Sequence, residues 1–264
     1  MRGYLIDMDG VIYRGGELVP GSDKFINQLL KNDIPFRFMT NNSQRTRLDV
    51  VVKLERLGIK VDEEHIFTCA MATARYLASQ NSRATAFVIG EGGLLTALHK
   101  SGIAINDQCP DYVIVGEGRT FNLEQVEKAV DFVTAGAKLI STNPDLSCPT
   151  STGIRPGCGA MTAMIEATTG RKAFSVGKPN PIMMRMVRKD LNLTTRETVV
   201  IGDMMDTDIF GAVQLEYHSV LVLSGGTKRA ELTNFAYQPS EIHTTLADYG
   251  KSAGIISESQ LVFN

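Results

Sequence analysis

Two carboxylates stand two residues apart near the start of the chain, directly after a short apolar run. Residues 3–6 have the composition of a buried strand, and Asp7 and Asp9 follow them. Carboxylates this close repel each other and lose hydration where a strand ends, so they favour binding a cation or sharing a proton. Mg²⁺ suits such an all-oxygen site, and Gly10 allows a sharp turn beside it. The alternative is an ordinary Asp-Gly turn after a strand.

The spacing excludes an EF-hand calcium loop. If Asp9 and Gly10 were the fifth and sixth positions of such a loop, Leu5 would be the first and Gly16 the twelfth. Neither residue carries the carboxylate that those positions require.

Two other phosphate-binding patterns also fail. A P-loop has a glycine where this chain has Lys172 and a serine or threonine where it has Pro179. Residues 90–93 are rich in glycine and weakly resemble a dinucleotide-binding turn, but Leu95 stands where the last glycine is needed. A tight turn between a strand and a helix is the simpler interpretation of that segment.

Polar, charged or glycine residues follow apolar strand-like segments at four places. These are Asp7 with Asp9, then Thr40 with Asn41 and Asn42, then Gly177 with Lys178 and Pro179, and finally Gly202 and Asp203 with Thr207 and Asp208. In an open parallel sheet, ligands bind in the crevice at the carboxyl ends of the strands. Each place alone has an ordinary alternative as a helix cap, a solvated lysine or a surface charge. Together, and in this order, they favour a catalytic site.

The four groups resemble the motifs of the haloacid dehalogenase superfamily of phosphotransferases, in the order that the superfamily has them. The asparagines after Thr40, the Gly-Lys-Pro segment and the large insertion after the second motif resemble the NagD-type class IIA of capped phosphatases, the nucleotide and p-nitrophenyl phosphatases. Further segments agree, namely residues 70–74, 88–92, 110–117, 142–145 and 158–160. The resemblance covers nearly the whole chain.

The resemblance implies covalent catalysis with a metal. Asp7 would attack phosphorus to form an aspartyl-phosphate, and Asp9 would protonate the leaving oxygen and then help water hydrolyse the intermediate. For the acid role, the pKa of Asp9 would have to be raised, for instance by burial and by Asp7. Mg²⁺ would be held by Asp7, the main-chain carbonyl of Asp9, and Asp203. Asp208 would orient this metal site.

The resemblance also implies how the substrate is held. The transferring oxygens would contact Thr40, the amides of Asn41 and Asn42, and Lys178, which acts as a point charge on phosphate. The partner is then a small phosphorylated metabolite, and NagD-type relatives point to nucleoside 5′-monophosphates. Sugar phosphates, phosphoglycolate, pyridoxal phosphate and p-nitrophenyl phosphate are alternatives, as is a catalytically silent protein that binds a phosphorylated metabolite.

Strand-like and helix-like segments alternate along the chain, which predicts α/β architecture with mainly parallel sheets. Strands are expected at residues 36–39, 86–89, 112–115, 138–140, 198–201 and 219–223, and helices at 43–57, 71–78, 94–100, 123–135 and 160–168. In the helix over 43–57 we expect Leu48, Val51, Val52 and Leu57 on one side. With the resemblance, this predicts a doubly wound, Rossmann-like core of residues 1–80 and 178–264 with an inserted α/β cap of residues 81–177.

The segment over residues 142–159 is the cap region that we expect to select the substrate. It is rich in Pro, Gly, Ser and Thr and follows a predicted strand, which favours a long loop facing the core. Asp145 and Arg155 are its candidate specificity residues. A solvated surface loop is the alternative, and the cap could also join copies of the chain in a homo-oligomer.

The composition limits the classes of partner. The chain has 264 residues, is 43% hydrophobic and carries a formal net charge of −2, which gives no electrostatic case for a nucleic acid polymer or an anionic membrane. With no membrane span and no room for a signal peptide before Asp7, we expect a cytoplasmic protein. The four cysteines lack zinc spacing, so reduced thiols are expected, with Cys158 as a weak site candidate between two glycines.

Overall fold

The computed structural model describes residues 2–150 and 152–257. The chain divides into two compact units, each of which is described by itself. The first unit comprises Met1–Thr40, Val51–Phe67 and Met184–Asn264, and the second comprises Asn41–Val50 and Thr68–Met183. Within the described ranges, the search for helices long and apolar enough to cross a bilayer finds no candidate.

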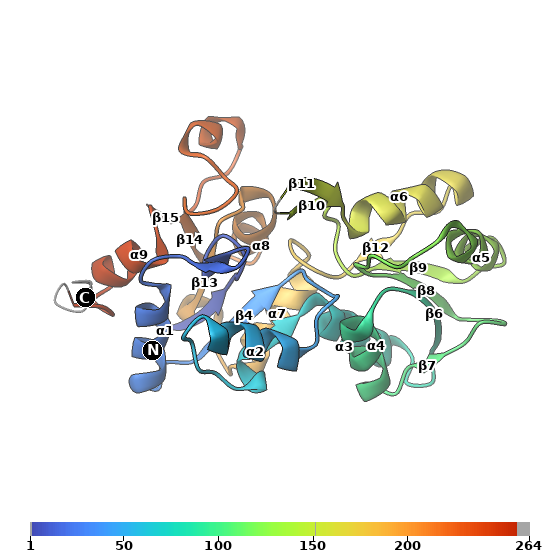
Figure 1. Cartoon of the computed structure of the whole chain (residues 1–264), viewed down its shortest axis with the longest axis horizontal. Coiled ribbons are helices and arrows are strands. Elements are labelled where there is room, and N and C mark those ends of the chain that lie inside the picture. Colours follow the sequence, from blue (N-terminus) through green and yellow to red (C-terminus); the bar gives the residue numbers. More distant parts are fainter. Residues whose placement is uncertain (1, 151, 258–264) are drawn as a thin grey trace. The chain divides into compact units, whose positions relative to one another are not determined.

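The first unit is built on a six-stranded sheet (Figure 1). In spatial order its strands are β15 (Glu241–His243), β14 (His218–Val222), β13 (Thr198–Gly202), β1 (Gly3–Ile6), β4 (Phe36–Thr40) and β5 (Ile66–Thr68). Every residue of β1 and β13 is buried. Strands covered on both faces have such continuous apolar runs, and the pairing of β1 with both neighbours is parallel.

The chain reverses its direction of travel across the sheet at β1. Ile6 of β1 lies opposite Phe38 of β4 on one side and opposite Ile201 of β13 on the other. The elements that come next along the chain lie on the β4 side, whereas the later strands β13 to β15 lie on the other side. In open α/β sheets, ligands bind outside the carboxyl ends of strands at such a reversal. Here β1 is followed by Asp7 and β13 by Asp203.

Helices and short turns flank this sheet. They are α1 (Ser22–Lys31), α2 (Arg47–Arg56), α7 (Pro181–Asp190), α8 (Phe210–Gln214) and α9 (Leu246–Ser252), with the short helices η1 (Glu63–His65), η2 (Thr195–Glu197), η3 (Met205–Ile209) and η4 (Arg229–Asn234) and the hairpin of β2 (Tyr13–Arg14) and β3 (Glu17–Leu18). The contact of α1 with α9 is aromatic, because the ring centroids of Phe25 and Tyr249 lie 6.0 Å apart. Phe25 also packs edge-on against Tyr4 of β1 at 5.8 Å.

The predicted helix over residues 43–57 is shorter than expected, and its predicted apolar side is wrong. The helix α2 begins at Arg47, because Thr46 and Asp49 cap each other: the Asp49 amide donates to Thr46 Oγ1 at 3.1 Å. Leu48 is 58% exposed, whereas Leu54 is fully buried. The buried side of α2 therefore contains Val50 and Leu54.

The second unit is a three-layer α/β unit (Figure 1). Its five-stranded sheet has the order β12 (Phe174–Ser175), β9 (Lys138–Ser141), β8 (Tyr112–Val115), β6 (Thr85–Ile89) and β7 (Ala104–Ile105), all paired in parallel. One face carries α3 (Cys69–Gln80) and α4 (Gly92–Lys100), and the other carries α5 (Leu123–Thr134) and α6 (Cys158–Thr169). The predicted strands and helices of this region are confirmed within a few residues.

The segment over residues 142–159, predicted as a loop, contains an antiparallel hairpin. Its strands are β10 (Ser147–Thr150) and β11 (Gly153–Pro156), with Cys148 opposite Arg155. A long loop was expected here, and the two strands show that this expectation of secondary structure is wrong. Pro149 and Pro156 made a strand prediction unfavourable here, because proline is depleted from strands and tolerated mainly in edge strands. Both strands of a two-stranded hairpin are edge strands, so proline is tolerated in them.

Candidate active site

Three carboxylates converge at the carboxyl ends of β1 and β13. Asp7 follows β1, Asp203 follows β13, and Asp208 lies within η3, one turn further along the chain. One oxygen from each lies within 4.8 Å of the others, and all three side chains are buried. Two parallel strands at the reversal of the sheet thus bring together residues that are about two hundred positions apart in the sequence.

Two glycines let the chain approach Asp203 closely. Gly10 adopts a φ of +81°, and a Cβ atom there would collide with Asp203 Oδ2. At Gly225 an added Cβ would collide with the same oxygen. The amide of Gly226 donates a hydrogen bond of 2.6 Å to Asp203 Oδ2. A hydrogen bond to a carboxylate favours its ionised form, which is the form that binds a cation.

The donor set of this cluster fits a hard divalent cation. Asp7, Asp203 and Asp208 offer only oxygen, and their burial removes the water that would otherwise screen their mutual repulsion. A cation of high charge density compensates three such groups, and Mg²⁺ prefers carboxylate oxygens with water completing its shell. Asp7, Asp203 and Asp208 therefore meet the chemical requirement of a magnesium site.

Asp9 is held differently from Asp7. Its side chain is exposed. The burial that we considered as one cause of a raised pKa at Asp9 is therefore absent. The Tyr13 hydroxyl is hydrogen-bonded to the Asp9 side chain. Burial of Tyr13, reinforced by the charges of Asp9 and Asp7, raises the pKa of this phenol far above its usual value, so it remains a donor. The Lys53 ammonium lies 3.3 Å from the centre of the Tyr13 ring.

Tyr13 is the site residue that sequence reasoning missed. Its only signal was its place four residues after Asp9, at the end of an apolar run that reads as buried. A hydrogen bond between side chains in a turn depends on backbone geometry, which residue types alone do not specify.

In the second unit, Asn41 links Lys178 to Asp145. Asn41 Oδ1 accepts a hydrogen bond of 2.8 Å from the Lys178 amide. Its Nδ2 donates to the Lys178 carbonyl and to Asp145 Oδ2, each at 3.0 Å. Asn143 Nδ2 in turn donates to the Asn41 carbonyl at 2.7 Å. Lys178 is 3% exposed, and the Asn41 side chain binds both main-chain polar groups of this buried residue.

Thr40 and Asn42 flank Asn41. Thr40 is the last residue of β4 and is 5% exposed. The Asn42 side chain accepts hydrogen bonds from the amides of Gln44 and Arg45, at 3.0 and 3.1 Å. Asn42 therefore shapes the turn before α2 through its side chain, which is the capping role weighed as an alternative for this segment.

Arg155 is engaged in a buried ion pair. Its Nη2 lies 3.1 Å from Glu117 Oε2, and the Glu117 side chain is 5% exposed. Burial raises the pKa of Glu117, and the neighbouring Arg155 opposes that rise. Cys148 Sγ donates to the other carboxylate oxygen of Glu117 at 3.4 Å. Glu117 thus ties both strands of the hairpin, β10 and β11, to the end of β8.

The four cysteines are free thiols in the structure. Cys158 is fully buried at the start of α6 and donates to the Val115 carbonyl at 3.2 Å. Burial raises the pKa of both Cys158 and Cys69, which keeps them protonated and poor nucleophiles. Cys158 has the contacts of a packing residue.

Family models match both ends of the chain. Residues 4–104 match the haloacid dehalogenase-like hydrolase model, and residues 175–249 match a second model of HAD-hydrolase-like proteins. The dihydroxyacetone phosphatase of Corynebacterium glutamicum is 40% identical over 93% of this chain and 89% of its own length. The chain belongs to the haloacid dehalogenase-like hydrolases. This HAD-family protein is a phosphatase, a phosphoric monoester hydrolase, as the resemblance implied.

Solved structures agree with this assignment. The ribonucleotide monophosphatase NagD of Escherichia coli is 36% identical over 94% of this chain and 98% of its own. Its structure superposes with a TM-score of 0.89. A 4-nitrophenylphosphatase from Thermotoga maritima, 30% identical over 95% and 97% of the two chains, gives 0.91. The predicted α/β fold class with parallel sheets and the predicted NagD-type family are confirmed for this HAD phosphatase.

Proposed function

We propose that this HAD phosphatase is a Mg²⁺-dependent enzyme that hydrolyses small phosphate monoesters through an aspartyl-phosphate at Asp7. The observation that carries the proposal is the convergence of Asp7, Asp203 and Asp208 within 4.8 Å. In this proposal Asp7 and Asp203, with the main-chain carbonyl of Asp9, bind the cation, and Asp208 orients them. The bound cation supplies positive charge that offsets the phosphate and the carboxylates.

The two chemical steps are assigned to Asp7 and Asp9. A carboxylate oxygen of Asp7 attacks phosphorus, the ester bond from phosphorus to the leaving oxygen breaks, and Asp9 gives its proton to that oxygen. Asp9, now a carboxylate, then takes a proton from a water molecule that attacks the phosphorus of the intermediate. The bond from phosphorus to Asp7 breaks, which releases inorganic phosphate and restores both residues. The Tyr13 hydroxyl keeps Asp9 oriented between the steps.

The transferring oxygens are proposed to be held by Thr40, the amides of Asn41 and Asn42, and the Lys178 ammonium. The bonds from the Asn41 side chain to both main-chain polar groups of Lys178 support this role, since they fix the lysine segment before substrate arrives. We also propose that residues 1–80 and 178–264 form the catalytic core and that residues 81–177 form an inserted cap.

We propose nucleoside 5′-monophosphates as the substrate class, supported by the similarity to the ribonucleotide monophosphatase NagD. Dihydroxyacetone phosphate is the second candidate, because the relative of that name is 40% identical to this chain, compared with 36% for NagD. The two candidate substrates differ in the size of the leaving group, and a comparison of their kcat/KM values distinguishes between them.

The test is the release of inorganic phosphate from a panel of esters, with Mg²⁺ and with excess chelator. The panel contains nucleoside 5′-monophosphates, dihydroxyacetone phosphate, other sugar phosphates, phosphoglycolate, pyridoxal phosphate and p-nitrophenyl phosphate. We expect release only with Mg²⁺ and the highest kcat/KM for a nucleoside 5′-monophosphate. Full activity in chelator would refute the metal assignment, and a higher kcat/KM for dihydroxyacetone phosphate would replace the first substrate by the second.

Selection among esters is proposed to depend on the cap, with Asp145 and Arg155 as its specificity residues. Because Glu117 fixes Arg155 at 3.1 Å, Arg155→Met removes one charged contact and frees the hairpin. We expect it to change the ratio of kcat/KM values between large and small esters by about 1–3 kcal/mol, the scale of a lost specific contact. The exposed Arg171, on the same unit, provides a matched control as Arg171→Met.

A further inference from the structure

A polar cavity lies in the first unit, at the edge of the sheet where the strands begin. It has a volume of about 260 Å³ and opens between α7, η2 and the turn that leads into β14. Asp7 and Asp203 follow the opposite ends of the strands. A five-residue strand such as β13 spans roughly 15 Å at about 3.3 Å per residue, so the cavity is separate from the carboxylate cluster.

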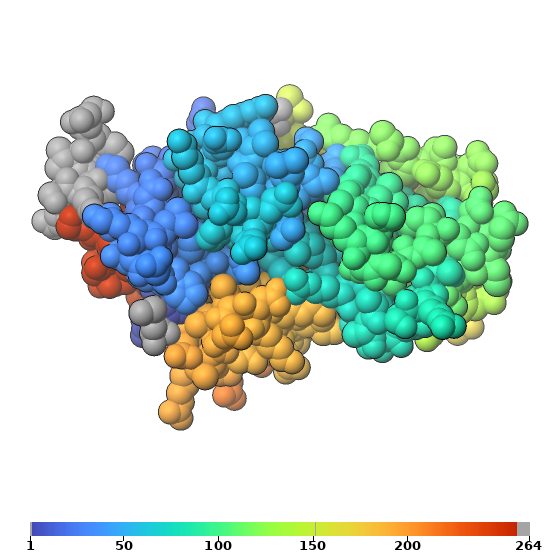
Figure 2. All heavy atoms as spheres, turned by 90° about the horizontal axis from the view of Figure 1, so that it is seen from below, coloured from blue at the N-terminus to red at the C-terminus, as the bar shows by residue number. Residues whose placement is uncertain are grey.

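The segment that forms one wall of this cavity is at the surface. In Figure 2 the gold region, which contains α7 and η2, covers the lower part of the face in view. Arg185 is exposed, and Arg188 is half-buried. The cavity is therefore accessible to a small solute from solvent.

The lining is dominated by hydrogen-bond donors. Arg185 and Arg188 come from α7 and Tyr217 directly precedes β14, with Thr195 and Gln214 as neutral donors. Among the residues that line the cavity, Glu216 is the single carboxylate. Two guanidinium groups against one carboxylate leave an excess of one positive charge, which favours an anion.

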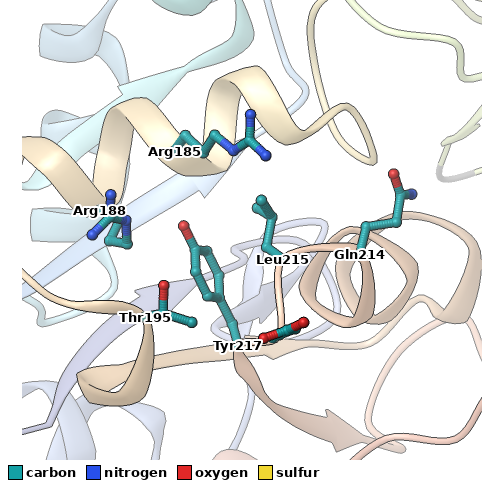
Figure 3. A pocket seen from close by; sticks show the side chains of 7 residues that line it. Arg185, Arg188, Thr195, Gln214, Leu215 and Tyr217 are labelled. Atoms are coloured by element: carbon teal, nitrogen blue, oxygen red, sulfur yellow. The ribbon is translucent and has the colours of Figure 1, made fainter.

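Arg188 and Tyr217 form the fixed side of the cavity. Arg188 Nη1 donates to the Leu193 carbonyl at 2.5 Å, which anchors the guanidinium. In Figure 3 the Tyr217 hydroxyl faces α7 beside Arg188, and the two side chains are hydrogen-bonded. Burial raises the pKa of Tyr217, while Arg188 and Arg185 oppose the rise. The phenol is therefore a protonated donor at neutral pH, held in place before any ligand arrives.

Arg185 forms the adaptable side. In Figure 3 it extends along α7 above Leu215, on the other side of the Tyr217 hydroxyl from Arg188. Within residues 2–150 and 152–257, its guanidinium makes no hydrogen bond or ion pair. A guanidinium presents planar, paired donors that match the oxygens of phosphate, and this one is not already committed within the protein.

We propose that this cavity binds a small oxyanion, a phosphate group carried by inorganic phosphate or by a phosphorylated metabolite, between Arg185 and the Arg188–Tyr217 pair. The site goes beyond the proposed reaction. Because no cluster of carboxylates lines the cavity to hold a cation, the phosphate group is retained and released without hydrolysis.

The experiment follows backbone amides of the cavity by NMR in the full chain. The Asp7→Asn background with Mg²⁺ is used, so that esters are not consumed. Inorganic phosphate, glycerol 3-phosphate and potassium chloride are titrated separately, and the amide signals of Thr195, Leu215 and Tyr217 are recorded. We expect saturable shifts with the two phosphates and none with chloride. Equal movement of these signals by chloride at matched ionic strength would overturn the proposal.

A matched pair of variants on α7 tests the contact itself. Arg185→Gln removes the adaptable guanidinium, whereas Lys189→Gln removes an exposed positive charge outside the cavity. We expect Arg185→Gln to weaken phosphate binding at the cavity signals by roughly tenfold, the effect of one lost charge-assisted hydrogen bond, and Lys189→Gln to leave it unchanged. Equal affinity in both variants contradicts the proposal. Tighter binding of glycerol 3-phosphate than of inorganic phosphate identifies a metabolite as the occupant, and equal binding identifies inorganic phosphate.

Discussion

At the scale of single residues, the two aspartates of the first motif occupy different environments. Asp7 is buried among carboxylates, whereas Asp9 is exposed and hydrogen-bonded to Tyr13. This difference suits a nucleophile that stays ionised beside a cation and an acid that exchanges protons with substrate and water. The sequence alone predicted both aspartates and their spacing. It did not predict that Tyr13 contacts Asp9, because that contact depends on the geometry of the turn.

Tyr13→Phe tests this contact. A hydrogen bond to the carboxylate favours its ionised form, so its loss raises the pKa of Asp9. In the proposed mechanism Asp9 acts as an acid in the first step, so we expect the basic limb of the pH profile of kcat/KM to move to higher pH. Tyr76→Phe, at a half-buried tyrosine in the second unit, is the control. An unmoved limb would show that Tyr13 serves packing alone.

Asp203→Asn tests the cation site. The substitution keeps the size of the side chain but removes one of three converging charges. We expect the Mg²⁺ concentration for half-maximal activity to rise by roughly tenfold to a hundredfold, or activity to vanish, because a charged ligand contributes about 1.5–3 kcal/mol. Asp206→Asn, at an exposed aspartate in the same turn, should leave the Mg²⁺ requirement unchanged. Similar requirements in both variants would remove Asp203 from the site.

At the scale of elements, most strands were predictable and the turns between them were not. The runs that became β1, β8 and β13 are mainly apolar and buried at every residue, which is typical of strands covered on both faces of a parallel sheet. The hairpin of β10 and β11 lacks that pattern and is held by a side chain, Glu117, that lies outside it. The apolar side of α2 was mispredicted because Leu48 and Val52 are exposed, whereas Val50 and Leu54 are the buried apolar residues.

Asn41→Asp tests the link between the segments of Lys178 and Asp145. The new carboxylate can still accept from the Lys178 amide, but it loses both donated hydrogen bonds and repels Asp145. We expect kcat to fall by roughly tenfold or more, since a small misplacement of a charged group costs that much. The chosen control is Asn32→Asp, which removes an exposed amide donor at the end of α1. Loss of stability without loss of kcat would show that Asn41 acts only in folding.

The edge of the core sheet gives a prediction on pH and stability. Glu241 of β15 contacts His243 at 2.9 Å and His218 of β14 at 2.8 Å. Hydrogen bonding to His243 and then to His218 lowers the pKa of Glu241 below its ordinary 4.5. The ionised Glu241 therefore stabilises the folded state at pH values above 4.5. This contribution is lost as the pH falls through the lower pKa that Glu241 has in the folded state.

Glu241→Gln should accordingly destabilise the protein near neutral pH, by about 0.2–1 kcal/mol for a partly exposed group. Urea unfolding of the variant and the parent protein measures the difference. We expect it to disappear in acid, below the folded-state pKa of Glu241. A difference that persists unchanged in acid would mean that the charge of Glu241 is not its cause.

At the scale of the whole molecule, the fold was accessible from sequence because four motifs, in a fixed order, sit at the ends of apolar strands. The resemblance implied that Asp7 and Asp203 share one cation site, and the structure has them at the ends of the neighbouring strands β1 and β13. Substrate choice was not accessible in the same way. In our proposal it depends on side chains such as Arg155, whose contact with Glu117 joins residues 38 positions apart in the sequence and follows no repeating pattern.

The central claim, a covalent intermediate at Asp7, is tested by trapping that intermediate. The enzyme is quenched in acid during turnover of a good substrate with Mg²⁺ and reduced with borohydride, which converts an aspartyl-phosphate to homoserine, and the peptide that contains Asp7 and Asp9 is sequenced by mass spectrometry. The account predicts homoserine at position 7 and an unmodified Asp9. Turnover with no modification at position 7, or with modification at Asp9 instead, would contradict it.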